Sequence, residues 1–437
     1  MNYGKPRHHS KYRGPRQDRR KDRDSGTGPA RLTKVTQRPL TVDAAGTIPA
    51  VYVKSKILHP LLYRKRVDRA ERAQPGDFVA VYNADGELSG YGLYNPRSEI
   101  AVRMLWHGPE LPTDVMWDER LGRAVSLRYD LLKLPEQSNA CRLVHGETDG
   151  LSGMVIDQFD DVLSAEVFSL GMYQRAQAIL QRLAPLTNTK HYLIQASPQF
   201  VSQEGADPPV VRSENLPGQV VIHEHGTRFR VRFEGGHKTG FFCDQRDNRK
   251  RLADFCAGKR VLDLCCYTGG FAVQAAKLGN ADQVTGVDLD HVPLALAREN
   301  ANLNQVRVKF VQADAFAYMR EMINQGRLYD VVILDPPKLI RTRAEIEEGT
   351  RKHFALNCLA MQLVAPGGVL LTCSCAGLLP DQEFTKLVVA ASRRVETANG
   401  VGRDIQILAK TGAAPDHAVL GNCLETEYLK AIWAVVN

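Results

Sequence analysis

The chain has 437 residues, of which 43% are hydrophobic and 24% charged, so it is long enough for about two to four domains with ordinary buried cores. The first 40 residues hold 12 Lys or Arg and 3 Asp or Glu, and the other 397 hold 45 basic and 46 acidic residues, so the formal charge of +8 comes from one end. We find neither an apolar run of about 18 residues nor an N-terminal signal core, which excludes a membrane or secreted protein and predicts a soluble, cytoplasmic one.

Residues 1–46 are predicted to form a disordered basic tail. The segment is rich in Arg, Lys, Gly and Pro and has little to bury, so folding would not offset its loss of entropy. A mitochondrial transit peptide is the alternative, but Asp18, Asp22 and Asp24 and the missing amphipathic pattern disfavour it. The tail either keeps the chain soluble or, as we favour, makes salt-sensitive contacts with nucleic-acid phosphates.

Residues 47–112 are predicted to form a small β-rich domain. The segments 78–82, 88–94 and 100–106 alternate with the period of a strand, and Asp85-Gly86 supplies a hairpin turn.

Residues 113–226 are predicted to form an α+β domain. Helices are expected at 118–133 and 172–184, and strands at 154–159, 162–169 and 191–195. A further hairpin turns at His225-Gly226 and leads into the last part of the chain.

Residues 227–437 alternate strand and helix, which predicts an α/β domain built on a doubly wound parallel sheet. The expected strands are 261–265, 283–289, 308–314, 329–335 and 368–374, and the expected helices lie near 269–278, 291–303, 314–325, 342–364 and 381–394. No helix is expected between the segments 404–410 and 427–436, which predicts an antiparallel hairpin at one edge of the sheet.

The cysteines indicate chemistry or packing rather than cross-links. There are nine, an odd number; Cys265 and Cys266 are adjacent, Cys373 and Cys375 are one residue apart, and no C-x-x-C occurs. We therefore expect reduced thiols, no disulfide framework and no metal site.

The expected parallel strands end in residues that suit a ligand crevice. The first ends in D-L-C-C-Y-T-G-G-F (263–271), a glycine-containing turn that lets backbone N–H groups approach a ligand. Asp288 ends the second strand, where a carboxylate typically binds ribose hydroxyls, and Asp314 ends the third, within reach of an adenine edge. The fourth ends in D-P-P-K (335–338), whose prolines fix an extended backbone.

This series resembles the class I S-adenosylmethionine-dependent methyltransferases. A nicotinamide enzyme would need G-x-G-x-x-G where this chain has Y-T-G-G-F. Enzymes of the resembling class that methylate exocyclic amines usually place an aromatic residue where this chain has Lys338, so amine methylation is disfavoured.

Two thiols are expected at the crevice, in L-L-T-C-S-C-A-G (370–377). Carbon 5 of a pyrimidine is too weak a nucleophile to accept a methyl group unaided, and a thiolate added at carbon 6 makes it nucleophilic. Cys375 lies nearer the loop, so it is the favoured nucleophile, with Cys373 as the alternative and a core role expected for the other. Asp335 is placed to hydrogen-bond the base, and the group that removes the carbon 5 proton is not identifiable.

Longer motifs are together similar to the large-subunit ribosomal RNA cytosine methyltransferases of the RlmI type. They are H-K-T-G-F-F-C-D-Q-R-D-N-R (237–249), V-L-D-L-C-C-Y-T-G-G-F-A, G-V-D-L-D, D-P-P-K and S-C-A-G-L (374–378). H-P-L-L-Y-R-K-R-V (59–67) with G-L-Y-N-P-R-S (92–98) resembles that family's PUA domain, and R-L-V-H-G-E-T-D-G-L-S-G (142–153) its central domain. The resemblance spans about 48–437 and leaves out the basic tail.

The resemblance implies S-adenosylmethionine as cofactor, large-subunit ribosomal RNA as partner, and Cys375 as nucleophile. The implied cofactor residues lie in the 237–249 loop and at the strand ends, and with the first-strand turn they make up the predicted set: Lys238, Arg246, Asp263, Tyr267, Thr268, Gly269, Asp288 and Asp314. Two features depart from the pattern: the thiol of Cys373, and Lys338 where the wider group of RNA cytosine methyltransferases frequently has a second cysteine that releases product. His417 and Glu427 also recur in the family, and we assign them no catalytic role.

The leading hypothesis is a methyltransferase that forms 5-methylcytosine in 23S ribosomal RNA. The alternatives are methylation of another RNA or base position, and a non-catalytic RNA-binding or ribosome-assembly factor with a vestigial cofactor site. The sequence is compatible with a homodimer and does not decide the oligomeric state.

Overall fold

The computed structural model describes residues 35–42, 46–56, 58–233, 240–397 and 400–437. Most of the predicted basic tail, and the predicted cofactor residue Lys238, lie outside these residues. Within them, none of the helices has the length and apolar character needed to cross a membrane.

The N-terminal part is a six-stranded sheet with the strand order β2-β6-β5-β4-β1-β3. The three predicted strands are present, and three short ones join them; the bounds are β1 Ala50–Val53, β2 Leu61–Tyr63, β3 Val67–Glu71, β4 Phe78–Tyr82, β5 Leu88–Tyr94 and β6 Ile100–His107. The additional strands had no clear sequence signal because they are short, and β3 is almost entirely exposed.

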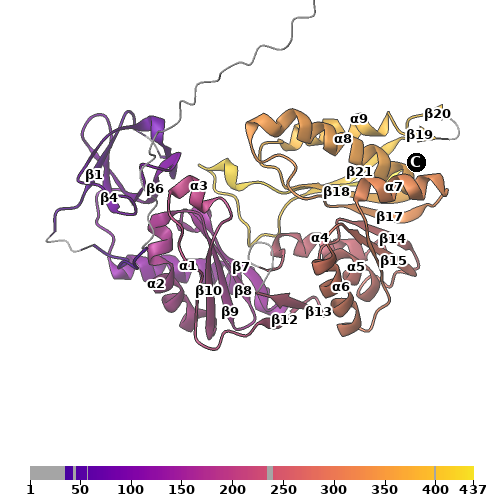
Figure 1. Ribbon diagram of the computed structural model, residues 1–437, viewed down its shortest axis with the longest axis horizontal. Helices are drawn as coiled ribbons and strands as arrows, with labels where there is room; N and C mark the ends of the chain where they lie inside the picture. Colours follow the sequence, from indigo (N-terminus) through magenta and orange to yellow (C-terminus); the bar gives the residue numbers. More distant parts are fainter. Residues whose placement is uncertain (1–34, 43–45, 57, 234–239, 398–399) are drawn as a thin grey trace, which may run out of the picture.

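The central part is a five-stranded sheet in the order β11-β10-β9-β8-β7, covered by helices α1 and α2 (Figure 1). Its elements are α1 Asp114–Ser126, β7 Ala140–His145, β8 Met154–Phe159, β9 Val162–Val167, α2 Leu170–Thr187, β10 His191–Ala196, α3 Phe200–Glu204 and β11 Val211–Arg212. Helix α1 begins earlier than predicted because the Thr113 hydroxyl caps it, accepting a hydrogen bond from the Met116 N–H. A π-helical turn, Leu127–Leu131, continues it.

The N-terminal and central sheets share one hydrophobic core. The rings of Trp106 on β6 and Trp117 on α1 meet edge to face with centroids 4.4 Å apart, and both are buried. Phe78 on β4 and Leu170 and Ala176 on α2 belong to the same buried cluster. These two parts therefore pack as one body.

The C-terminal part is a seven-stranded sheet in the order β16-β15-β14-β17-β18-β22-β21, which confirms the predicted α/β architecture. The strands are β14 Arg260–Leu264, β15 Gln283–Asp288, β16 Lys309–Gln312, β17 Tyr329–Leu334, β18 Val364–Ser374, β21 Ile405–Thr411 and β22 Lys430–Val436. All pairs from β16 to β18 are parallel, and β22 is antiparallel to both β18 and β21, so the predicted edge hairpin is present.

Helices cover both faces of this sheet (Figure 1). They are α4 Arg246–Ala253, α5 Gly270–Lys277, α6 His291–Leu303, α7 Ala315–Asn324, α8 Ile346–Leu363 and α9 Asp381–Ser392. Leu252 of α4 and Phe271 of α5 pack in one core cluster, and Met319 of α7, Leu356 of α8 and Phe384 of α9 pack in another. A two-stranded ribbon, β19 Glu396–Thr397 and β20 Gly400–Val401, follows α9.

A hairpin joins the central part to the C-terminal part. Its strands, β12 Gln219–Glu224 and β13 Thr227–Arg232, turn at His225-Gly226 as predicted. Phe229 of β13 packs in one cluster with Phe159 of β8 and Val273 of α5.

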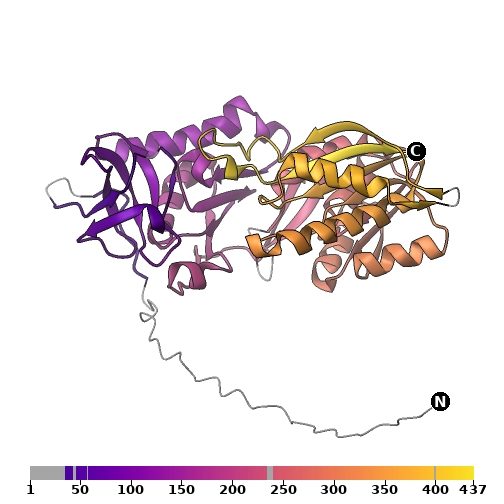
Figure 2. The ribbon, with the colours of Figure 1, turned by 90° about the horizontal axis from the view of Figure 1, so that it is seen from above.

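The segment between β21 and β22, residues 412–429, reaches back from the C-terminal part to the other two; we call it the return loop. Figure 2 shows it as a yellow segment lying over the central sheet. Asn422 donates a hydrogen bond to the Leu58 carbonyl at 2.9 Å, and the Ala418 carbonyl accepts one from the Thr148 hydroxyl at 2.9 Å.

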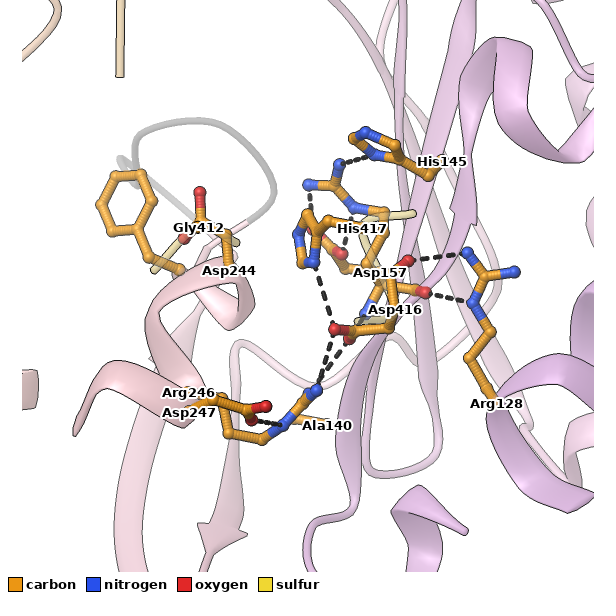
Figure 3. A network of polar contacts seen from close by, with 12 residues as sticks. Arg128, Ala140, His145, Asp157, Asp244, Arg246, Asp247, Gly412, Asp416 and His417 are labelled. Atoms are coloured by element: carbon orange, nitrogen blue, oxygen red, sulfur yellow. Dashed lines mark hydrogen bonds and ion pairs between the residues drawn. The ribbon is translucent and has the colours of Figure 1, made fainter. Parts of the chain in front are cut away.

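Asp416 of the return loop is the centre of a buried ionic network (Figure 3). Its carboxylate accepts two hydrogen bonds from the Arg246 guanidinium, at 2.8 and 3.0 Å, and one from the Arg142 backbone N–H at 2.8 Å. Its carbonyl accepts one from Arg128, at 2.7 Å, and Arg128 is itself paired with Asp149. Burial opposes ionisation of Asp416, but His417 and Arg246 outweigh it and hold the pKa of this carboxyl well below its usual range.

Removing the Asp416 carboxylate should destabilise the chain strongly. Asp416→Ala leaves the buried Arg246 guanidinium without its main partner, which typically costs about 3–5 kcal/mol of unfolding free energy. Because the pKa of Asp416 is depressed in the folded state, its stabilisation is present above the unfolded pKa of about 3.9 and is lost as the pH falls. Denaturant unfolding of wild type and variant should therefore differ less in acid than at pH 7.

Glu383→Ala is the matched control for this substitution. It breaks an exposed pair with Lys386, for which we expect a change of less than about 1 kcal/mol at either pH. Equal losses for the two variants would contradict a dominant role for Asp416.

Candidate active site

Four carboxylates gather where the parallel strands of the C-terminal sheet end. Asp263 lies on β14, Asp288 ends β15, and Asp314 and Asp335 follow β16 and β17. The strand register places Leu264 beside both Val287 and Leu334, so these ends lie at one edge of the sheet. The predicted strand ends therefore lie together at the carboxyl edge of the sheet, where ligands bind in folds of this kind.

The turn after β14 has an unusual backbone. Cys265, Tyr267 and Gly269 have φ angles of +62°, +49° and +79°, and positive φ is uncommon in residues other than glycine. Two hydrogen bonds hold the turn: the Tyr267 N–H donates to the Asp288 carboxylate at 2.8 Å, and the Asn300 side chain donates to the Thr268 carbonyl at 3.0 Å. Such strain persists only where the surroundings fix it, and it is commonly found at ligand sites.

The glycine in this turn is required by close packing as well as by its backbone angle. A Cβ atom on Gly269 would lie 3.2 Å from both the Ala297 Cβ on α6 and the Phe310 ring on β16. On the neighbouring strand, a Cβ atom on Gly286 would lie 2.8 Å from the same ring and 3.1 Å from the Cys266 sulfur. The turn therefore lies directly against β15 and α6.

Asp263 is buried with one oxygen unused. Its Oδ2 accepts a hydrogen bond from the Ala272 N–H in the first turn of α5, at 2.9 Å, and its Oδ1 has no hydrogen-bond partner among the described residues. Burial raises the pKa of Asp263 well above its usual value, and the charges of Asp335 and Asp288 raise it further. A ligand with hydrogen-bond donors and positive charge would satisfy this group.

Two other predicted cofactor residues make bonds within the fold. Asp288 accepts a hydrogen bond from Asp290 N–H, at 3.0 Å, besides the one from Tyr267. Asp314 caps α7 by accepting from Ala317 N–H at 3.0 Å, and it is exposed to solvent. Both carboxylates therefore stabilise the backbone at the edge of the sheet where a ligand would lie.

Arg246, predicted as a cofactor residue, lies elsewhere. Its guanidinium is buried in the network of Asp416 and also pairs with Asp247 at 3.4 Å (Figure 3). Arg246 thus lies at the junction with the central part. The other predicted residues within the described chain lie together at the carboxyl edge of the sheet: Asp263, Tyr267, Thr268, Gly269, Asp288, Asp314, Asp335 and the two thiols.

The two predicted thiols differ in exposure. Cys373 lies on β18, fully buried among Leu371, Trp433 and other apolar side chains, whereas Cys375 follows the strand and is partly exposed. Burial raises the pKa of the Cys373 thiol well above its usual value, and the Asp335 charge raises it further. Cys373 is therefore protonated at neutral pH and a poor nucleophile.

A directed chain of hydrogen bonds ends on Asp335. Trp433 Nε1 donates to the Thr411 hydroxyl at 2.9 Å, and that hydroxyl donates to Asn248 Oδ1 at 2.6 Å. Asn248 Nδ2 then donates to Gln245 Oε1 at 2.6 Å, and Gln245 Nε2 donates to Asp335 Oδ2 at 3.0 Å. Every bond points its proton toward the carboxylate, and the last of them orients Asp335.

Sequence reasoning did not assign functions to Gln245, Asn248 or Tyr428. The Tyr428 hydroxyl, at the end of the return loop, donates to Asp244 at 2.6 Å, and burial and the Asp244 charge raise the pKa of this tyrosine well above its usual value. The D-Q-R-D-N run (244–248) was the available signal: five polar residues that start a helix and are nearly all buried.

The expectation of no metal site stays a prediction. Outside the crevice, His59, Cys423 and Glu425 bring one potential ligand atom each to within 4.8 Å of the others, where the return loop meets the N-terminal sheet. His59 Nε2 and Glu425 Oε2 are 3.3 Å apart and form a hydrogen bond with each other.

Comparison with protein families gives two matches. A model described as S-adenosylmethionine-dependent methyltransferase matches residues 141–392, and a model of a PUA-like domain matches residues 54–106. The first covers more than half of the chain, including every strand-end residue described above.

The match to curated relatives covers nearly the whole length of those proteins. Proteins named ribosomal RNA large subunit methyltransferase I from Photobacterium profundum and Aeromonas hydrophila are 35% and 37% identical over 387 and 382 residues, which is 87% and 86% of this chain and 96% and 94% of theirs. Among solved structures, a putative methyltransferase complexed with S-adenosylhomocysteine has a TM-score of 0.75 at 20% sequence identity. A putative S-adenosylmethionine-dependent methyltransferase from Streptococcus mutans has a TM-score of 0.74 at 19% identity. Each match covers 89% of this chain and 100% of the solved chain. These structures share the fold.

Gly269→Ala should test the packing of the turn. The substitution combines a left-handed backbone angle with a Cβ atom held against Ala297 and Phe310, so we expect a loss of about 2 kcal/mol or more in unfolding free energy. Gly326→Ala is the control, because it has a similar φ of +65° and nothing within 4 Å of the added Cβ, and should lose about 1 kcal/mol. Equal losses in denaturant unfolding would show that the contacts to α6 and β16 contribute nothing.

Proposed function

Because the chain belongs to the ribosomal RNA large subunit methyltransferase I family of S-adenosylmethionine-dependent methyltransferases, we propose that it methylates carbon 5 of a cytosine in 23S ribosomal RNA through a covalent bond to Cys375. The observation that carries this proposal is a partly exposed thiol at the end of β18, at the same sheet edge as Asp335 and the cofactor strand ends.

The crevice fits S-adenosylmethionine. The cofactor has a sulfonium and an ammonium, and the orphaned Asp263 oxygen and its neighbouring carboxylates suit that charge. We propose that Tyr267, Thr268 and Gly269 contact the cofactor, that Asp288 binds the ribose, and that Asp314 reaches the adenine edge. When bound, the cofactor supplies an electrophilic methyl group.

The protein must then make carbon 5 nucleophilic. The Cys375 thiolate adds to carbon 6 of the cytosine, the 5,6 double bond shifts to carbons 4 and 5, and nitrogen 3 takes up the displaced electron pair and a proton. The enamine so formed attacks the methyl group through carbon 5, which releases S-adenosylhomocysteine. Asp335, oriented by Gln245, hydrogen-bonds the base and stabilises its protonated ring. After methylation a base removes the carbon 5 proton, the double bond re-forms, and the carbon–sulfur bond breaks to return the thiolate.

The favoured nucleophile is Cys375 rather than Cys373. A thiol must be ionised and accessible to attack a base, and Cys373 is neither. Cys373 instead packs under Asp335 as an apolar residue of the core.

We propose the following division of the chain for RNA binding. Residues 47–112, which contain the PUA-like match, bind RNA together with the central domain, 113–226, and the methyltransferase domain, 227–437, holds a base flipped out of its stack. The exposed turn Arg64–Arg66 adds positive charge to the first of these. The tail, 1–46, adds salt-dependent affinity without sequence preference.

The nucleophile can be tested with two matched variants. We expect Cys375→Ala to abolish methylation of 23S ribosomal RNA and the covalent adduct with RNA that contains 5-fluorocytosine, because no thiolate remains to add to carbon 6. Cys373→Ala should keep both activities. Mass spectrometry of the RNA and gel shift of the adduct measure the two outcomes.

The opposite pattern would assign attack to Cys373. If ribosomal RNA from cells without the gene retains every 5-methylcytosine, the cytosine assignment is wrong and another base or RNA is the substrate. Absence of S-adenosylmethionine binding in calorimetry would instead indicate an RNA-binding factor with a vestigial site.

A further inference from the structure

Lys430 is a buried lysine beside the end of β18. It is the first residue of β22 and is paired with Ser374 in the antiparallel register, so it lies opposite the residue that separates Cys373 from Cys375. Only 5% of its surface is exposed, and lysines are rarely this buried without a specific partner.

The ammonium group of Lys430 is directed at the turn that carries Cys375. It donates a hydrogen bond of 2.6 Å to the carbonyl oxygen of Ala376, the residue directly after the cysteine. The Ser374 hydroxyl braces the other side of this turn by accepting from the Ala376 N–H at 3.4 Å. Lys430 therefore holds the backbone directly after Cys375 in place.

The charged groups around Lys430 come from every element packed against it. They are Cys375, Glu427 of the return loop, Asp381 at the start of α9, Lys338 after β17, and His353 on α8. Burial, and then the charge of Lys430, lower the pKa of His353 to about 4, so this imidazole is neutral near pH 7. Lys338 is exposed, which leaves Lys430 as the buried cation of the group.

We propose that Lys430 is the positioning residue of the Cys375 nucleophile: its ammonium holds the turn through the Ala376 carbonyl and stabilises the thiolate by its charge. A lysine next to a cysteine is one of the arrangements that favour the thiolate form. The proposal rests on the proposed function of Cys375 and goes beyond it by naming the group that activates the thiol.

The ionisation of Lys430 limits the pH range of this effect. Burial lowers its pKa to about 8, while the neighbouring Cys375 and carboxylates partly oppose that change. The ammonium is therefore mostly present at pH 7 and is lost as the pH rises above 8, so the stabilisation of the thiolate is strongest below that value.

The test measures the thiol directly. In the full-length protein, without RNA or cofactor, the rate of Cys375 alkylation by iodoacetamide is followed against pH by peptide mass spectrometry. Lys430→Met keeps an unbranched side chain that is one atom shorter and removes the charge, so the midpoint of the profile should move up by one pH unit or more, with about tenfold slower alkylation at pH 7. Lys430→Arg keeps the charge and should keep the wild-type midpoint.

Two references accompany the measurement. Lys410→Met removes a lysine that also interacts with Asp381 but is exposed on β21, and it should leave the midpoint unchanged. Cys358 on α8, partly exposed and bonded to the Ala391 carbonyl, reports in the same digest whether the fold has loosened.

An unchanged midpoint in Lys430→Met overturns the proposal. If that variant also accelerates alkylation of Cys358, Lys430→Arg decides: a wild-type midpoint supports the proposal and an upward shift overturns it. Because the assay needs neither RNA nor cofactor, failure of the cytosine assignment would appear in the methylation experiment and not here.

Discussion

The ion pair between Asp416 and Arg246 is the constraint on which the site depends. It joins the return loop to the start of α4, and the Arg142 N–H and the Arg128 guanidinium extend the same network into the central sheet. Gln245, directly before Arg246, is the donor that orients Asp335. The position of Asp335 is thus tied to the docking of the central part through Asp416, which is 170 residues from Arg246 in the sequence.

The return loop and the first residue of β22 make three contacts with the site. The Gly412 carbonyl accepts a hydrogen bond from Asn248, a member of the chain that ends on Asp335. Tyr428 then binds Asp244, and Lys430, the first residue after the loop, binds the Ala376 carbonyl next to Cys375. Opening the loop would therefore disturb the carboxylate, the α4 turn and the thiol together, which explains why so many polar side chains are buried at this junction.

The strand ends could be predicted from the sequence and the polar network could not. Buried parallel strands are continuous β-branched runs, so the strand-end residues Asp263 and Asp288 follow from the pattern, and the observed order of strands confirms the predicted sheet. Arg246 was assigned to the cofactor from the family resemblance of residues 237–249, and nothing in the sequence indicates that it pairs with Asp416, 170 residues away. Strands β1 to β3 were missed because β1 and β2 have only four and three residues, too few to establish a period, and β3 is almost entirely exposed.

The charges at the cofactor site and on the rest of the chain indicate that RNA affinity does not come from the cofactor site. The cofactor crevice gathers carboxylates whose mutual repulsion contributes to the raised pKa of Asp263, and the chain beyond residue 40 has a net charge of −1. A polyanion such as the proposed RNA substrate gains little from approaching such an edge, so its binding free energy must come from surfaces outside the crevice. Lys430 adds one buried cation at the end of β18, where it donates a hydrogen bond to the carbonyl of Ala376, the residue after Cys375. We therefore expect the surfaces that attract the proposed RNA substrate to differ from the edge at which we propose it is methylated, because carboxylates that suit a cationic cofactor repel a polyanion.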